Sequence, residues 1–188
     1  MSEAHKIIHE LMEEAGAARA HFHTWRVLRN LALPEFYETM NDLSYVDFFH
    51  TSNSGHYNLF FLALSKIYDR DPRVSGISQL KDVLRHEDHE HLAEALETSL
   101  ISMGNLVALV MNIRNKTIVH NERGLSREKV YEINGVTPNE IQHLIDVTCE
   151  AINDVARGLG LPNRIAAHDR HERATMSMLE RLRNGKTR

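Results

Sequence analysis

The chain has 188 residues, a formal net charge of −4, thirteen histidines and a single cysteine, Cys149. This length suits one domain with one core, and the small negative charge excludes a protein covered by a basic field, so any nucleic-acid contact must be local. One cysteine excludes an intramolecular disulfide and a cysteine-based zinc site, which favours a reducing, cytoplasmic compartment.

Apolar residues recur every three or four positions, and glycine and proline are scarce, which predicts an all-α fold. The first helix is expected from about Ser2 to Asn30. One apolar stripe runs along it: Ile7, Leu11, Ala15, Ala18, Phe22 and Trp25. Pro34 can open a second helix that carries Phe36, Met40, Leu43 and Val46. The sequence leaves open whether this helix breaks at "HTSNSG" or continues through it.

The middle of the chain contains a loop, "DRDPRVSG", and a short helix, "SQLKDVLR". A long helix is then expected from about Glu87 to His120. Its second half, Ile101 to Ile113, is nearly all apolar and is expected to be buried on several faces. The most apolar stretch, "LISMGNLVALVMNI", is short and interrupted, and the start "MSEAHKIIHE" has no basic segment followed by an apolar one. A soluble protein with no membrane partner is therefore expected.

The last part of the chain begins with a helix-start signal, "TPNE". Thr137 suits the N-cap, Pro138 the first helical position and Glu140 a capping box. This helix is expected to end at the glycines 158 and 160, and a final Arg-rich helix is expected from about 163 to 183. We therefore expect a helical domain over residues 1–160 and an appended arm over 161–188.

The stretch "NIRNKTIVHNER" allows two interpretations. It is the polar end of an apolar helix, where Arg114 and Lys116 favour the helix dipole. Alternatively, it is a site for phosphodiester cleavage, because His120 can exchange a proton near pH 7 and Arg114 can stabilise charge on a phosphoryl group. Asn115 would orient the reacting groups. One histidine supplies a base but no separate acid, so this mechanism implies a homodimer with the motif at its interface.

Two segments carry a resemblance to a known family: "RNKTIVH" at the end of the long helix and "LSKIYDRD" upstream of it. Together with the capped helix after them, they resemble the abortive-infection branch of the HEPN superfamily, over roughly residues 5–159. The resemblance implies a bundle of about five or six helices that dimerises. It further implies metal-independent RNA cleavage that leaves a 2′,3′-cyclic phosphate, in a toxin or phage-defence role, by Arg114, Asn115 and His120.

Other features around this motif complete the expectation. Lys116, Asn121 and Arg123 are the expected contacts to RNA, no cofactor is expected, and an antitoxin or regulatory protein is a further candidate partner. The alternative function is a non-catalytic HEPN module that binds nucleotide, RNA or a partner protein through the same cleft.

Two clusters of histidine and charged residues are interpreted as solvent-exposed helix surfaces rather than as binding sites. His86, His89 and Glu90 in "RHEDHEH" could share a metal ion, but a solvated helix start is favoured. The acids among the arginines of the final helix favour a solvated face with intrahelical pairs over an RNA track. His21 and His23 are expected at the surface.

Overall fold

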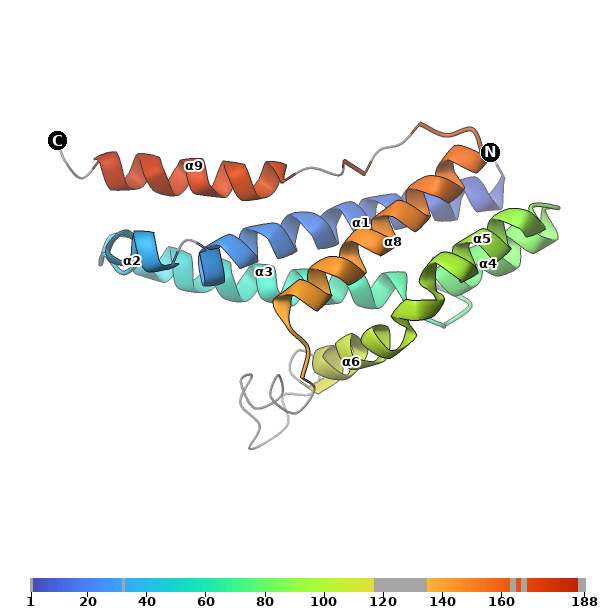
Figure 1. Ribbon diagram of the computed structural model, residues 1–188, viewed down its shortest axis with the longest axis horizontal. Helices are drawn as coiled ribbons and strands as arrows, with labels where there is room; N and C mark the ends of the chain where they lie inside the picture. Colours follow the sequence, from blue (N-terminus) through green and yellow to red (C-terminus); the bar gives the residue numbers. More distant parts are fainter. Residues whose placement is uncertain (1, 32, 117–134, 163–164, 167–168, 186–188) are drawn as a thin grey trace.

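The computed structural model describes residues 2–31, 33–116, 135–162, 165–166 and 169–185, and every regular element in these ranges is helical. Two long helices, α1 (Glu3–Arg26) and α3 (Val46–Ile67), lie side by side, and α8 (Pro138–Gly158) packs obliquely against α1 (Figure 1). The shorter helices pack around this group. The all-α prediction is confirmed.

Helix α1 forms because its apolar residues fall on one face and its first turn is capped. The Ser2 hydroxyl accepts a hydrogen bond from the His5 backbone N–H. All six residues of the predicted stripe are buried, and they face α3 and α8. A short π-helical segment, η1 (Val27–Leu31), continues α1 and leads into α2 (Leu33–Met40).

The boundary between the second and third helices differs from the prediction. Helix α2 ends at Met40, Leu43 lies in the following turn with 93% of its surface exposed, and Val46 begins α3. Helix α3 runs without a break through "HTSNSG". Gly55 and the small polar residues beside it are tolerated there because the buried aromatic residues of α3 fix the helix against α1.

The predicted long helix is three elements. After α4 (Ile77–His86), the chain turns at Asp88, whose φ is 61°, and α5 (Glu90–Leu100) begins. A 3-10 turn, η2 (Ile101–Met103), then separates α5 from α6 (Gly104–Arg114). The backbone therefore shifts between the charged and the apolar halves, and α4 packs beside α5 (Figure 1).

The expectation that Ile101 to Ile113 is buried on several faces is wrong. Only Met103, Val110 and Ile113 are buried in this segment, and Ile101 is 76% exposed. One face of α6 meets α3 and α8, and no described element covers the rest. By length and composition alone, Glu90–Arg114 could cross a membrane, and 22% of its most apolar 18-residue window is buried. Such a single segment is weak support for a membrane span.

In the C-terminal part, the predicted capping box of α8 is confirmed, and α9 makes contacts that the sequence did not predict. The capping box is present, because Glu140 N–H donates to the Thr137 hydroxyl and the Glu140 carboxylate accepts from Thr137 N–H. Helix α9 (Arg170–Gly185) packs on α1, η1 and α2. It contributes to a second, smaller apolar cluster beside the main core, made of Val27, Leu28, Phe36, Met40, Phe49 and Leu179.

Candidate functional site

The candidate catalytic segment begins at the end of α6. Val110 and Ile113 point into the core and fix the last turns of this helix. Arg114 is the last residue of α6, and Asn115 and Lys116 continue the backbone as π-helix. The sequence thus places a guanidinium on a helical turn that is anchored by its apolar neighbours.

The guanidinium of Arg114 contacts the residue that follows it. Its Nη1 donates a hydrogen bond to Oδ1 of Asn115 at 2.8 Å, while its Nε is buried without a hydrogen-bond partner. Arg114 is half-buried, Asn115 is exposed and Lys116 is half-buried. Within the described part of the chain, Arg114 forms no ion pair with a carboxylate. No carboxylate among the described residues therefore neutralises the positive charge of Arg114, which is available to an anionic ligand.

The remaining predicted residues, His120, Asn121 and Arg123, lie outside the described residues. The structure thus brings together Arg114 and Asn115 of the proposed catalytic set. These two groups can bind and orient a phosphate, because a planar guanidinium matches two phosphoryl oxygens and the amide of Asn115 holds the guanidinium in place. Proton transfer would need His120.

The upstream segment "LSKIYDRD" ties α3 to α8. The Tyr68 hydroxyl is 2.5 Å from Oγ1 of Thr148, and burial raises the pKa of Tyr68 to about 12. Asp69 closes the turn after α3 by accepting a hydrogen bond from Asp71 N–H at 2.9 Å. Tyr68 thus joins α3 to α8, and Asp69 stabilises the turn that follows α3.

The metal alternative has no geometric support in the described residues. His86 ends α4, His89 precedes α5 and Glu90 begins α5. No group of three or more histidine, cysteine, aspartate or glutamate side chains among the described residues is arranged to hold a metal ion. His86 and Glu90 are exposed, as expected for a solvated helix start.

Comparison with known proteins identifies the fold. The family model of the HEPN AbiU2 proteins matches residues 1–176. The chain belongs to the HEPN AbiU2 family. No curated protein and no solved structure matches it. The match extends past residue 159, where the resemblance in the sequence ended, and includes the first turns of α9.

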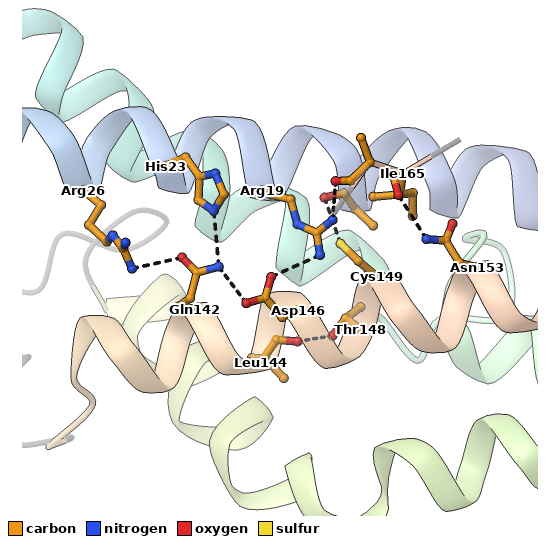
Figure 2. A network of polar contacts seen from close by, with 12 residues as sticks. Arg19, His23, Arg26, Gln142, Leu144, Asp146, Thr148, Cys149, Asn153 and Ile165 are labelled. Atoms are coloured by element: carbon orange, nitrogen blue, oxygen red, sulfur yellow. Dashed lines mark hydrogen bonds and ion pairs between the residues drawn. The ribbon is translucent and has the colours of Figure 1, made fainter. Parts of the chain in front are cut away.

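The HEPN bundle contains a second polar cluster, which the sequence did not reveal (Figure 2). Arg19 is buried between α1 and α8, where its Nη2 lies 3.1 Å from Oδ1 of Asp146 and its Nη1 donates to the Ala166 carbonyl at 2.6 Å. His23 is buried too, so its expected surface position is wrong. Gln142 lies between His23 and Asp146.

A weak signal for this cluster existed in the sequence. Arg19 and His23 stand one residue after Ala18 and Phe22, at the edge of the apolar stripe of α1. Their polar partners Gln142 and Asp146 are likewise four residues apart on α8, at the edge of its apolar face. Two such polar edges on different helices indicate a buried contact only once the helices are known to pack together.

Proposed function

We propose that this HEPN protein is a metal-independent endoribonuclease that acts as a homodimer. The main support for this proposal is the state of the Arg114 guanidinium. It is anchored at the end of a core helix, oriented by Asn115 and not neutralised by a carboxylate among the described residues. Such a preorganised cation stabilises the charge that develops on a phosphoryl group during cleavage.

The reaction is attack of a ribose 2′-hydroxyl on the adjacent phosphate. His120 of one chain takes the proton of the 2′-hydroxyl as the new oxygen–phosphorus bond forms. His120 of the second chain gives a proton to the departing 5′-oxygen as its bond to phosphorus breaks. The products are a 2′,3′-cyclic phosphate and a 5′-hydroxyl, so atoms and protons balance without a metal ion or cofactor.

We propose that the dimer forms through the stretch that ends in Arg114. Ile101 is 76% exposed on this stretch, whereas Leu106, Val107 and Leu109 are half-buried and pack against the main core. Association of two chains around Ile101 would bring two copies of the Arg114 segment together.

The test is cleavage of a mixed pool of structured and single-stranded RNA by the purified chain in EDTA. The parent should produce fragments with cyclic-phosphate ends. His120→Ala should abolish cleavage, and Arg114→Lys should lower it by roughly 10²–10³-fold, because lysine keeps the charge but loses the planar fork.

Matched controls come from exposed residues of the same types. His143 on α8 and Arg181 on α9 are exposed, so His143→Ala and Arg181→Lys should cleave like the parent. Cleavage that persists in the His120 and Arg114 variants would refute the assignment. RNA binding by the parent without any cleavage would instead support the non-catalytic HEPN module.

A further inference from the structure

A pocket of about 590 Å³ lies at the bend between α5 and α6, where α4 and the loop after α3 complete its walls. Figure 1 shows the bend between these two helices. The volume falls within the range of about 300–1,000 Å³ that is usual for small-ligand pockets. Apolar side chains of α4 and α5 line part of the pocket, among them Ile77, Leu96 and Leu100, and polar side chains line the rest. Neither Arg114 nor Asn115 lines it, so this pocket is distinct from the candidate catalytic site.

Tyr68 gives the pocket an aromatic residue in its lining. Its side chain is half-buried, and its hydroxyl is held by the contact with Oγ1 of Thr148 on α8. Because the ring is already fixed, little further conformational freedom is lost when a flat group packs against it. Nucleobases stack on such rings with little dependence on sequence, because every base has a π-face. A nucleobase is therefore a suitable occupant of this pocket.

The charges around the pocket favour an anion. Arg70 lines the pocket, is exposed, and forms no ion pair within the described part of the chain. Lys81 also lines it and lies 3.1 Å from the carboxylate of Glu97. The same carboxylate lies 3.1 Å from Arg85, so two cations offset the charge of Glu97. The guanidinium of Arg70 is therefore left to bind a phosphate.

The pocket shares one side of α6 with Arg114. Gly104 and Val107 line the pocket, and Arg114 follows Val107 by seven residues. Seven residues are nearly two turns of an α-helix, so Val107 and Arg114 point in nearly the same direction, about 10 Å apart along the axis. Ile101 also lines the pocket, which places the pocket beside the proposed contact between two chains. An RNA strand with one phosphate at Arg114 can therefore reach the pocket with a nearby nucleotide.

We propose that this pocket is a base-binding subsite for single-stranded RNA: the base of a nucleotide near the cleaved bond stacks on Tyr68, and Arg70 binds its phosphate. The inference rests on the proposed function for the identity of the ligand, RNA, but not on cleavage itself. It gives the segment "LSKIYDRD" a role in binding beside its role in packing, because Tyr68 and Arg70 both belong to it. The subsite requires an unpaired strand, since a base must leave its own stack to enter the pocket.

Binding of a labelled, single-stranded RNA of about ten nucleotides, measured by fluorescence anisotropy in EDTA, tests the role of Arg70. All variants carry His120→Ala so that the RNA stays intact. Arg70→Gln should weaken binding, and the slope of log K against log salt concentration should fall by about 0.7, as expected for one lost phosphate contact on a single strand. Arg73→Gln is the matched control, because Arg73 is exposed in the same loop, lies 2.6 Å from the Asp71 carboxylate and does not line the pocket. An unchanged salt slope in Arg70→Gln would overturn the proposal.

Gly104→Leu tests whether the pocket is occupied. The φ of Gly104 is −55°, and a Cβ added there meets nothing within 4 Å, so leucine can fill part of the pocket without backbone strain. This variant should bind the RNA about 5- to 100-fold more weakly, which is the range for loss of one base–aromatic stack. Gly55→Leu on α3, where an added Cβ also meets nothing within 4 Å, should bind like the parent. Parent-like binding by Gly104→Leu would overturn the proposal.

An RNA of the same length that lacks its bases separates the base from the backbone. Gly104→Leu should have little effect on the affinity for this abasic RNA, because no base is expelled from the pocket. An equal loss of affinity for both RNAs would mean that the pocket does not hold a base, and would overturn the proposal.

These outcomes also separate the subsite from the proposed nuclease. RNA binding that depends on Arg70 and Gly104, without cleavage by the parent, would support the subsite and refute the nuclease. Cleavage by the parent, with unchanged binding in both variants, would support the nuclease and overturn the subsite. Absence of any RNA binding would overturn the subsite too. The salt slope of Arg70→Gln decides the matter if melting curves show that Gly104→Leu fails to fold.

Discussion

The ion pair between Arg19 and Asp146 predicts an asymmetric response to mutation. The Arg19 side chain is 8% exposed and that of Asp146 is 49% exposed, although they are 3.1 Å apart. Arg19 also carries a buried Nε without a hydrogen-bond partner. Most of the cost of dehydrating this pair therefore falls on the arginine.

The two single variants should differ in their free energy of unfolding. Asp146→Ala leaves a buried guanidinium without its counter-charge, which costs about 1–3 kcal/mol. Arg19→Met removes the buried charge together with its unpaired Nε, and the exposed Ala166 carbonyl and Asp146 carboxylate can bind water instead. This change should cost about 1 kcal/mol or less. The double variant should resemble Arg19→Met.

Urea unfolding at pH 7.5, followed by circular dichroism at 222 nm, measures these differences. At this size, 1 kcal/mol corresponds to a thermal shift of about 2–4 °C, so melting curves give a second measurement. A larger loss in Arg19→Met than in Asp146→Ala would refute the reasoning, because it would mean that the pair stabilises the fold more than burial of the charge destabilises it.

Three further predictions concern single positions. Thr137→Ala should cost about 1 kcal/mol of stability by removing the N-cap of α8, whereas Thr137→Ser should cost little, as melting curves would show. Gly55→Ala should stabilise α3 by about 0.5–1 kcal/mol, because an added Cβ meets nothing within 4 Å. Gly76→Ala should instead cost about 1–3 kcal/mol, because the added Cβ would lie 2.5 Å from the Asp69 carbonyl oxygen. Ile101→Glu should lower the mass measured by light scattering toward that of a monomer and reduce RNA cleavage with it; a dimeric Ile101→Glu variant would place the interface elsewhere.

Local signals in the sequence predicted local structure well. The Thr137 and Glu140 capping box, the turn before α4 and the buried stripe of α1 are confirmed, because each depends on residues within a few positions of one another. The family was also predicted, since its segments are short and contiguous. The boundary at residue 160 and the cytoplasmic location stay predictions.

Burial was harder to predict wherever it depends on another element. Periodicity identified the faces of α6 that are apolar but not the element that covers each face, so the exposure of Ile101 was missed. His23 was misplaced for the same reason, because its partner Gln142 is 119 residues away. Arginines of the final helix were expected to pair within it, and Arg173 does so with Asp169, yet Arg183 pairs with Glu35 of α2.

The candidate site combines both kinds of information. The identity of Arg114 and Asn115 came from a contiguous motif, and the structure adds that their side chains bond to each other at 2.8 Å. The role of His120 stays a prediction, because this residue lies outside the described residues. The sequence could name the chemical groups, but whether Arg114 meets a carboxylate depends on tertiary contacts.

Two features that weaken an isolated chain support each other in the proposed dimer. The exposed Ile101 side chain gains nothing from folding, and a half-buried guanidinium with an unpaired Nε has lost part of its hydration. Both lie on the stretch from η2 to the end of α6. Association around Ile101 would bury this side chain and concentrate positive charge from two Arg114 side chains. The free energy of apolar burial would then offset the repulsion between the two cations, and a bound phosphate would relieve that repulsion. RNA should consequently stabilise the dimer, and dimerisation should tighten RNA binding by the same factor.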